Sequence, residues 1–357
     1  MWGGAGAIGA LANATFGLNR ASAAFADAAL ADRSRRIPYG ACVNLAPLQK
    51  KPEYRAALTA YCQQLTPEYG LFWNYLRPSR DRFDFDFADQ VLAFAEARQM
   101  TMRGHTLVWY AAMPDWTKEI DSPAEVESVL EAHIETVVAR YRGKIKTWHV
   151  VNEPIAEAKG SVADLRASIW LKYLGAKYID TAFRLAHEVD PAAELLLNEY
   201  DIEYVEQGSA ARRQALLALI HDLLARGTPL HGVGLQGHIR ATHRIDRDGL
   251  YNFVSEIKSL GLSVHVTELD VIDRDLPAPI AVRDVLAAAR AYDFLSPICA
   301  AMRPSVIASW GITDRYTWMP MWNKRSDGLA NRPLPLDDQY RPKPLWSVID
   351  YFCQQAA

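Results

Sequence analysis

The sequence has few cysteines, almost no net charge and no long apolar run. Its 357 residues include 4 cysteines, and none of them has the Cys-x-x-Cys spacing of a zinc or redox unit. Lysine and arginine number 39 against 42 acidic residues, and the net charge of -3 gives no basic footprint for nucleic acid. The longest uncharged apolar opening, residues 1–12, is shorter than the roughly 20 residues that a membrane-spanning helix needs. We therefore expect neither nucleic acid nor a membrane as a partner.

The first 36 residues are rich in glycine and alanine, but they lack the positively charged start of a secretory signal. Residues 21–26 (ASAAFA) have the small side chains found at signal cleavage sites. Two interpretations stay open, namely an export signal whose start is truncated or misassigned, and an alanine-rich tail. The first predicts a protein exported to the periplasm or the extracellular space.

The four cysteines, Cys42, Cys62, Cys299 and Cys353, lie far apart in the sequence. In an exported protein they could form one or two disulfides, and four cysteines allow three full pairings. Buried free thiols are the other interpretation, and the sequence does not decide between them.

From Tyr39 onward, short β-rich runs alternate with amphipathic helical stretches. The predicted strands are 39–44, 62–68, 101–108, 145–152, 194–198, 233–238, 263–268 and 306–310. The predicted helices are 87–98, 123–141, 169–188, 210–226, 249–260 and 281–293.

Strands that alternate with helices predict a parallel sheet, either closed as a (β/α)8 TIM barrel or open and doubly wound. The even number of strands and the absence of a usable nucleotide-binding loop favour the barrel. No Pro/Gly/Ser-rich linker interrupts residues 38–355, so we predict one α/β catalytic barrel over residues 37–357, behind a leader of residues 1–36.

Polar and aromatic residues fall at the C-terminal ends of seven predicted strands, where barrels of this kind carry their chemistry. They are Glu68, His105 with Trp109, Asn152 with Glu153, Asn198 to Tyr200, Gln236 with His238, Glu268 with Asp270, and Trp310. Residues scattered over the surface would not all fall at the same end of successive strands. We therefore predict a functional site at that face of the barrel.

Glu153 and Glu268 each end an apolar strand that should be buried on both faces. A carboxylate in such a place is costly unless it is hydrogen-bonded or functional. A structural role is the alternative for either residue alone, but two carboxylates at equivalent strand ends can meet across the barrel mouth. Cleavage of a glycosidic bond needs such a pair, one as proton donor and one as nucleophile or base. The aromatic content fits a sugar-binding cleft, since 10 tryptophans and 16 tyrosines are more than a core of this size needs.

Seven motifs in register resemble glycoside hydrolase family 10, the endo-β-1,4-xylanases and close relatives. They are WHVVNE (148–153), VTELD (266–270), RGHTLVW (103–109), GVGLQGHI (232–239), TPE (66–68), NEY (198–200) and WGITD (310–314). The similarity runs in order from about residue 38 to Pro344, which is essentially the whole barrel.

The resemblance implies a retaining double-displacement mechanism, with Glu153 as general acid/base and Glu268 as nucleophile. In retaining enzymes the two carboxyl groups lie about 5 to 5.5 Å apart. The acid must keep its proton near neutral pH, so its pKa must be raised while that of its partner is not.

The resemblance also implies roles for the residues around the pair. Asn152 would bond the sugar 2-hydroxyl, Gln236 would hold Glu153, and His238, oriented by Asp270, would bond Glu268. The remaining substrate contacts would come from His105, Trp109, Tyr200, Trp310 and Trp318 in the cleft and from Glu68 one subsite further along. By contrast, Trp73, Trp116, Trp322 and Trp346 are interpreted as packing or loop anchors.

Three residues depart from the family pattern. Tyr69 stands where family members have an asparagine, Phe72 where they have a lysine, and Tyr110 where a second histidine is expected. Replacing polar partners by aromatic residues changes which sugar is selected as well as how tightly it binds. The substrate could therefore be a decorated, less polar or differently linked β-glycan instead of plain xylan.

A further alternative is an inactive barrel that only binds glycan, but such a relative would be expected to have lost one of the catalytic residues. No cluster with zinc spacing and no calcium loop occurs in the sequence, so we expect no metal and no cofactor. We expect a monomer whose partner is a polysaccharide, xylan or a related β-glycan.

Overall fold

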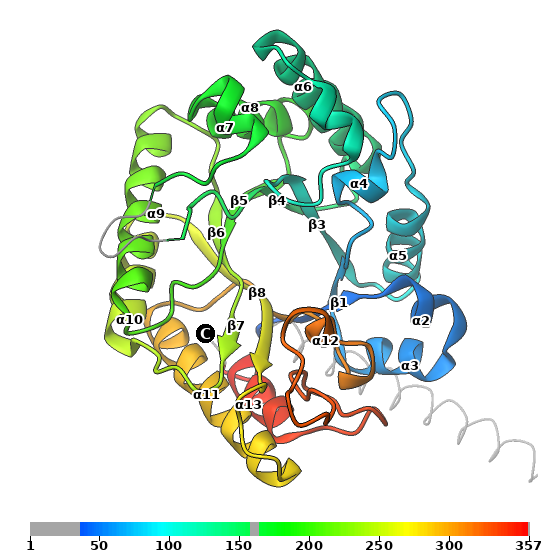
Figure 1. Cartoon of the computed structure of the whole chain (residues 1–357), viewed down its shortest axis with the longest axis vertical. Coiled ribbons are helices and arrows are strands. Elements are labelled where there is room, and N and C mark those ends of the chain that lie inside the picture. The colour runs from blue at the N-terminus through cyan, green and yellow to red at the C-terminus, as the bar shows by residue number, and fades with distance from the viewer. Residues whose placement is uncertain (1–35, 158–163, 356–357) are drawn as a thin grey trace, which may run out of the picture.

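Nine parallel strands, of which the short β6 and β7 follow each other along β8 and share one place in the barrel, pair edge to edge until the sheet closes on itself (Figure 1). The computed structural model describes residues 36–157 and 164–355, so nearly all of the predicted leader, residues 1–36, lies outside the described residues. The strands are β1 (Tyr39–Val43), β2 (Gln64–Pro67), β3 (Thr101–Val108), β4 (Thr147–Asn152), β5 (Glu194–Glu199), β6 (Gly232–Leu235), β7 (His238–Arg240), β8 (Ser263–Ile272) and β9 (Ile307–Ser309). The predicted TIM barrel is therefore confirmed, and the open doubly wound alternative is wrong.

The barrel closes where the first strand meets the last, and β6 pairs directly with β8. Tyr39 of β1 pairs with Ile307 of β9, and Gly232 of β6 pairs with Ser263 of β8. The short strand β7 lies beyond the end of β6 and pairs with the far part of β8. All of these pairs are parallel, so the C-terminal ends of the strands meet at one face of the barrel.

The prediction of one strand over residues 233–238 is wrong, because the chain breaks between β6 and β7. Gly237 has a φ of 77°, in the left-handed region that favours glycine. A Cβ atom at this position would also lie only 2.9 Å from the ring of Phe294. After the break, His238 opens β7 and pairs with Asp270 of β8.

Helices cover the outside of the barrel, except for the short α12 (Met319–Trp322), which lies at its mouth (Figure 1). They are α2 (Leu45–Lys50), α3 (Pro52–Tyr61), α4 (Trp73–Leu76), α5 (Asp86–Glu96), α6 (Pro123–Tyr141), α7 (Ile169–Leu174), α8 (Lys177–Val189), α9 (Gln207–Ala225), α10 (Arg247–Ser259), α11 (Ile280–Ala301), α12 (Met319–Trp322) and α13 (Pro344–Cys353). Two 3-10 turns, η1 (Asp115–Glu119) and η2 (Asp314–Tyr316), lie in loops at the same face as the site.

Two predicted helices differ from the observed ones. The stretch 169–188 is not one helix but two, because Gly175 takes a φ of 66° and ends α7. Helix α11 continues to Ala301, past the predicted end at residue 293, since Phe294, Leu295 and Ile298 are buried in the core. By contrast, α6 matches its prediction, with Ser122 as N-cap and Pro123 in its first turn.

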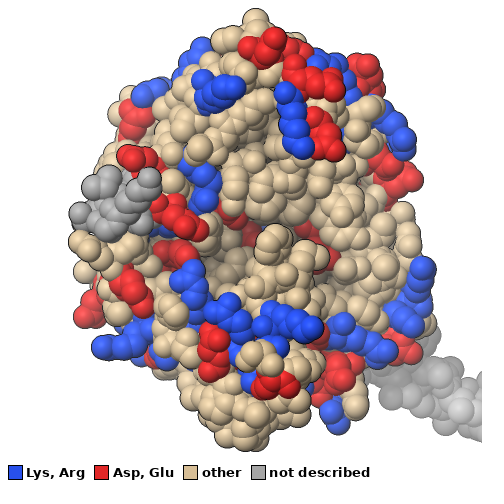
Figure 2. Space-filling view, viewed as in Figure 1, with Lys and Arg blue, Asp and Glu red and all other residues tan. Residues whose placement is uncertain are grey.

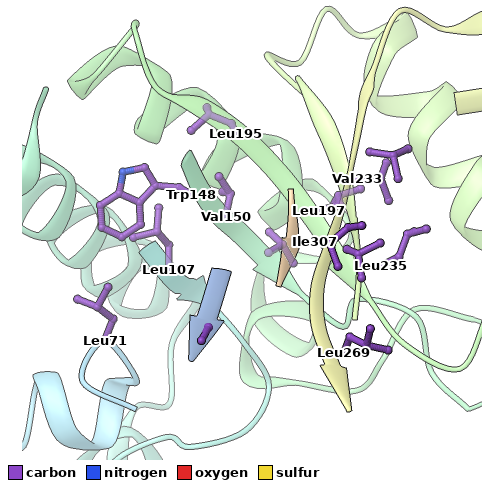
Figure 3. Packing of buried hydrophobic residues seen from close by; sticks show 14 of the residues in the cluster. Leu71, Leu107, Trp148, Val150, Leu195, Leu197, Val233, Leu235, Leu269 and Ile307 are labelled. Atoms are coloured by element: carbon purple, nitrogen blue, oxygen red, sulfur yellow. The ribbon is translucent and has the colours of Figure 1, made fainter. Parts of the chain in front are cut away.

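The core consists of apolar side chains from the strands and from the helices around them (Figure 3). All six residues of β4 are buried, as expected for a strand covered on both sides. Trp148 of β4 lies against Gly104 of β3, where a Cβ atom would come within 2.1 Å of the indole ring. Only glycine fits at position 104, and this close approach fixes β3 beside β4.

All four cysteines are free thiols in the structure, and Cys42, Cys62 and Cys353 are buried. Of the two interpretations open from the sequence, the free thiols are therefore the one observed. None of the helices in the part of the chain that the structure describes is both long and apolar enough to cross a membrane.

Candidate active site

The residues predicted at the strand ends gather at one face of the barrel, around a hollow. Figure 2 shows this face, with acidic atoms visible inside the hollow and lysine and arginine side chains along part of its rim. The hollow is built by strands β2 to β9, so residues far apart in sequence line it together.

Glu153 directly follows β4 and has an unusual backbone conformation. Its φ of 53° lies in the left-handed region, which is uncommon for a residue other than glycine. The backbone N–H of Glu153 donates to the carbonyl oxygen of Asn198 (2.8 Å), and Arg166 Nε donates to the carbonyl oxygen of Glu153 (3.0 Å). These two bonds hold the strained residue in place on both sides of its Cα atom.

The carboxyl group of Glu153 is buried beside several hydrogen-bond donors. Its Oε1 atom accepts from Gln236 Nε2 (3.0 Å), as predicted, and from Asn152 Nδ2 (3.2 Å). Burial raises the pKa of Glu153, although donation from Gln236 opposes the shift. The negative charge of Glu268 adds to the increase, so Glu153 tends to keep its proton.

Glu268 lies on β8, where its carboxylate is buried but accepts from donors on two other strands. Asn198 Nδ2 donates to Oε1 (2.7 Å), and His238 Nε2 lies 3.3 Å from Oε2. Burial alone would raise the pKa of Glu268, but His105, His238 and Arg103 together outweigh it and lower the pKa. Glu153 and Glu268 thus have pKa values shifted in opposite directions, as an acid and a nucleophile require.

His238 connects Glu268 to a second carboxylate, as predicted from the sequence. Its Nδ1 lies 2.9 Å from Asp270 Oδ1, and Asp270 Oδ2 accepts from Trp318 Nε1 (2.8 Å). Burial disfavours the charged imidazolium, but Asp270 and Glu268 outweigh it and hold the pKa of His238 well above its usual range. His238 is therefore a cation between two carboxylates, and it favours the ionised form of Glu268.

Asn198 was noted at the end of its strand and within a family motif, but no role was predicted for it. Its Nδ2 donates to Asn152 Oδ1 (2.7 Å) as well as to Glu268, and its Oδ1 accepts from Thr267 Oγ1 (2.8 Å). A Cβ atom at position 234 would lie 2.2 Å from Asn198 Oδ1, so Gly234 leaves the space that this amide occupies. The sequence signal that could have identified Asn198 is an amide side chain at the end of a strand expected to be buried.

Arg103 lies beneath the carboxylates and was not predicted as a site residue. Its guanidinium is completely buried, and Nη2 donates across the barrel to the carbonyl oxygen of Thr267 (2.6 Å). Within the described residues, Nε and Nη1 of Arg103 have no hydrogen-bond partner. Burial lowers the pKa of Arg103 to about 10, so this side chain still carries its positive charge at neutral pH. The sequence signal that could have identified Arg103 is a charged side chain in the middle of a strand expected to be buried.

His105 lies beside Glu268, where it was expected, but it is paired with a second histidine. The Nδ1 atoms of His105 and His149 are 2.7 Å apart, and His105 Nδ1 is 3.9 Å from Glu268 Oε1. Burial lowers the pKa of His105 to about 4, so it is neutral at neutral pH and His238 and Arg103 supply the positive charge near Glu268.

His105, His149 and Glu268 are also the one group in the described ranges with the proximity of metal ligands, their donor atoms lying within 4.8 Å of one another. The two facing Nδ1 atoms form a hydrogen bond with each other, in which one must donate and the other accept. This use of both atoms does not fit a metal ion held by the same nitrogens.

Aromatic rings line the hollow above Glu153 and Glu268. Trp310 contacts His105 edge to face (5.1 Å between ring centres), and Trp318 contacts His238 (5.2 Å). Phe72, one of the departures from the family pattern, lies in the same group, 5.6 Å from His105 and 5.1 Å from Trp109. Phe72 therefore gives this part of the hollow an apolar side where a lysine would have placed a charge.

The other two departures are placed differently. Tyr69 packs its ring against Tyr75 (4.5 Å) and Phe87 (4.8 Å), so it belongs to the contact between its loop and α5. Tyr110 contacts Trp109 edge to face (5.7 Å), and the guanidinium of Arg166 lies over its ring (4.5 Å).

Arg166 also positions Tyr200, which was predicted in the cleft. Arg166 Nη2 donates to Tyr200 Oη (2.9 Å) and to the carbonyl oxygen of Ile155 (2.8 Å). The guanidinium of Arg212 lies over the Tyr200 ring, 4.4 Å from its centre. Arg166 thus links the Tyr200 hydroxyl to the backbone of Glu153.

Glu68, at the end of β2, lies apart from the other two carboxylates. It accepts from Asn44 Nδ2 (2.8 Å) and lines a narrow pocket with Trp310 and Tyr316. Burial raises the pKa of Glu68 to about 7, although the bond from Asn44 opposes the shift. Glu68 and Trp310 thus line the same pocket, and the place of Glu68 one sugar away from the catalytic pair stays a prediction.

Three of the four tryptophans interpreted as anchors are packed. Trp73 is buried and stacks on His133 (3.6 Å between ring centres), Trp116 donates to the carbonyl oxygen of Arg77 (2.9 Å), and Trp346 contacts Tyr39 (5.0 Å). For Trp322 the interpretation is wrong, because this side chain is 72% exposed. The exposure of Trp322 has no sequence signal, because the four-residue helix that carries it is too short for a periodic pattern.

A parallel barrel with two buried carboxylates and a ring of tryptophans at the C-terminal ends of its strands defines a glycoside hydrolase. Comparison with known families agrees. The family model for glycosyl hydrolase family 10 matches residues 27–351, and the chain belongs to this family.

Relatives in this family share about a third of their residues with the chain. It is 32% identical to endo-1,4-beta-xylanase B of Paenibacillus barcinonensis over 325 residues, which cover 87% of this chain and 94% of that protein. It is 34% identical to endo-1,4-beta-xylanase B of Thermotoga neapolitana over 289 residues, covering 80% and 79%. The crystal structure of xylanase 10B from Thermotoga petrophila RKU-1 in complex with xylobiose matches with a TM-score of 0.79 at 31% identity, covering 90% of this chain and 95% of that one.

Proposed function

We propose that this protein is a retaining endo-β-1,4-xylanase that cleaves internal bonds of xylan. One observation carries the proposal, namely that Glu153 and Glu268 lie at the same barrel mouth with pKa values shifted in opposite directions. The named activity of the relatives from Paenibacillus barcinonensis and Thermotoga neapolitana supports xylan as the substrate.

In the first step, the Glu268 carboxylate attacks the anomeric carbon while Glu153 gives its proton to the leaving glycosidic oxygen. A covalent glycosyl–enzyme ester forms, and the C–O bond to the leaving sugar breaks. In the second step, Glu153, now ionised, takes a proton from water, and that water displaces Glu268 from the anomeric carbon. The configuration at this carbon is therefore retained.

The surrounding residues support both steps. Asn152 is placed to bond the sugar 2-hydroxyl, a contact that strengthens in the transition state. Asn198 and His238 donate to Glu268 and keep it ionised before the attack. Trp109, Trp310 and Trp318 offer flat faces to the sugar ring, Tyr200 and His105 lie at its edges, and Glu68 is placed for the neighbouring sugar.

The direct test is the release of reducing sugar from a panel of xylans and β-glucans, with Glu268→Ala as the blank. We expect activity on β-1,4-xylan that the blank lacks. Equal activity of Glu268→Ala and the unchanged protein would contradict the mechanism. Proton NMR of the first product adds the stereochemistry, and a β-anomer is expected.

A second candidate substrate is a decorated or less polar β-glycan. Phe72 supports it, because an aromatic ring lies beside His105 and Trp109 where the family pattern has a lysine. A site without that charge binds bare hydroxyls less well and tolerates an apolar substituent better. The same panel decides, since this candidate predicts higher kcat/KM on an acetylated or aryl-substituted xylan than on the unsubstituted polymer.

We further propose that the protein is exported and acts as a monomer. The family match begins at residue 27, directly after the small residues 21–26 that resemble a cleavage site. All of the predicted catalytic contacts come from a single chain. N-terminal sequencing of the secreted protein tests export, and a retained Met1 would contradict it. Light scattering tests the monomer, whose mass should not exceed the 39.9 kDa of the full chain.

A further inference from the structure

Two large apolar side chains stand out into solvent from the short helix α12. Met321 is 76% exposed and Trp322 is 72% exposed, although the preceding Met319 is buried. Single exposed apolar residues are common, but a tryptophan and a methionine side by side place far more apolar area in water. Figure 1 shows α12 at the barrel mouth, near the ends of β1 and β8.

The backbone under these two residues is firmly held, so their exposure is a fixed feature of the fold. At the start of α12, its N-cap Trp318 donates to Asp270 (2.8 Å) and Pro320 restricts the first turn. At its end, the N–H of Asn323 donates to the carbonyl oxygen of Met319 (2.7 Å), and the carbonyl oxygen of Asn323 accepts from Asn331 (3.0 Å).

The segment after α12 is also fixed to the end of β8. Arg325 is buried and donates to the carbonyl oxygens of Asp273 and Leu276, and Asn331 donates to the Asp273 carboxylate (2.9 Å). Arg325 and Asn331 thus fasten this loop to the strand that carries Glu268.

The exposed pair follows Trp318, an aromatic residue of the hollow, within one turn of the chain. Trp318, in contact with His238, and Trp322 are four residues apart, which is about one helical turn or 5.4 Å along the axis. A sugar chain that runs out of the hollow past Trp318 would therefore reach α12 next. The indole face suits the C–H side of a pyranose ring, and the flexible methionine adapts to its edge.

We propose that Met321 and Trp322 form an additional sugar-binding platform on the rim, which binds the β-glycan chain outside the catalytic hollow. This proposal rests on the proposed function, since its ligand is a further part of the same substrate. The platform acts only on chains long enough to reach it, so it favours polymer over short oligosaccharides.

The experiment compares a soluble xylan polymer with 4-nitrophenyl β-xylobioside on the full-length protein and on Trp322→Ala. We expect the ratio of kcat/KM on polymer to kcat/KM on the short substrate to fall about 2- to 10-fold, the range of an aromatic stacking contact. Trp322→Phe keeps a flat ring and should restore most of the ratio. Tyr351→Ala is the matched control, because it removes an exposed aromatic residue from the outer helix α13.

Each outcome decides the proposal. An unchanged ratio in Trp322→Ala, or an equal loss on both substrates, would overturn it. The proposal would also be overturned if the wild-type protein dimerised, Trp322→Ala abolished the dimer and the kcat/KM ratio stayed constant. The exposed surface would then bind a second copy of the chain. A wild-type protein inactive on every β-glycan would contradict the proposed function itself. The platform would then be tested by the binding of xylohexaose, which Trp322→Ala should weaken relative to Tyr351→Ala.

Discussion

The side-chain nitrogen of Asn198 lies 2.7 Å from Glu268 Oε1 and 2.7 Å from Asn152 Oδ1. One amide therefore uses both of its N–H groups to connect the carboxylate on β8 with the amide at the end of β4. Asn152 in turn donates to Glu153 (3.2 Å). The two carboxylates of the site are linked by a chain of hydrogen bonds that contains no other charged group.

Removing this link should reduce activity more than stability. Asn198→Ala takes a donor from the buried Glu268 carboxylate, and a hydrogen bond to a charged group is worth about 1.5–3 kcal/mol. We expect kcat/KM on an aryl β-xyloside to fall about 10- to 100-fold. Asn74→Ala, an exposed asparagine on α4, is the control for the substitution itself. Equal activity of the two variants would show that Asn198 does not position the nucleophile.

The roles of Glu153 and Glu268 can be separated with a substrate whose leaving group needs no proton. Glu153→Ala should lose about 10²- to 10⁴-fold in kcat on xylan, the range expected for loss of a general acid. On an aryl β-xyloside with a good leaving group the first step should survive, and azide should restore turnover and yield a β-glycosyl azide. Glu268→Ala lacks the nucleophile, so azide should give no β-product. Rescue of Glu268→Ala with a β-product would reverse the assignment.

The pH profile should report the charge of Arg103. Activity needs Glu268 ionised and Glu153 protonated, so kcat/KM falls as the pH drops through the pKa of Glu268 and as it rises through the pKa of Glu153. Arg103 favours the ionised form of Glu268, so Arg103→Met should raise that pKa and move the acid limb upward by about one pH unit. Arg103→Lys keeps the charge and should leave the limb closer to its original position. A loss of activity with an unmoved acid limb would mean that Arg103 serves the fold alone.

The departures from the family pattern predict different effects at two neighbouring positions. Phe72→Lys places an ammonium group beside His105 and Trp109, and we expect kcat/KM on unsubstituted xylan to rise about 10-fold through bonds to sugar hydroxyls.

Tyr69→Asn removes a ring packed on Tyr75 and Phe87, so it should lower the free energy of unfolding by about 2 kcal/mol. Denaturant titration measures the loss of stability in Tyr69→Asn, and the substrate panel measures the activity of both variants. A gain in activity from Tyr69→Asn alone would place Tyr69 in the cleft.

Much of the barrel could be predicted because its strands leave a strong local signal. Strand β3 and helix α6 match their predicted bounds, since one is a short buried run and the other has an N-cap serine with a proline in its first turn. The break at Gly237 and the split at Gly175 could not be placed, because glycine also occurs in regular strands and helices. The four-residue helices α4 and α12 are too short for a periodic pattern.

The site residues, too, could be predicted only where the local sequence carries a signal. Glu153 and Glu268 could be found because a carboxylate at the end of an apolar strand conflicts with its surroundings. Asn198 and Arg103 act through bonds across the barrel, to residues 70 and 164 positions away. The exposure of Trp322 depends on how Asp270 and Asp273 anchor the loop. Such relationships exist only once the strands have closed into a barrel.

The backbone of Glu153 sets a limit on how this protein can change. A residue other than glycine in the left-handed region costs roughly 1–3 kcal/mol, and the surrounding bonds from Asn198 and Arg166 must offset it. Glycine would occupy the position without that cost, but it carries no proton to donate. Mutational drift toward a more relaxed backbone at this position therefore leads away from catalysis. A screen that selects for thermal stability alone should enrich inactive barrels, whereas one that also selects for xylan cleavage should retain the strained glutamate.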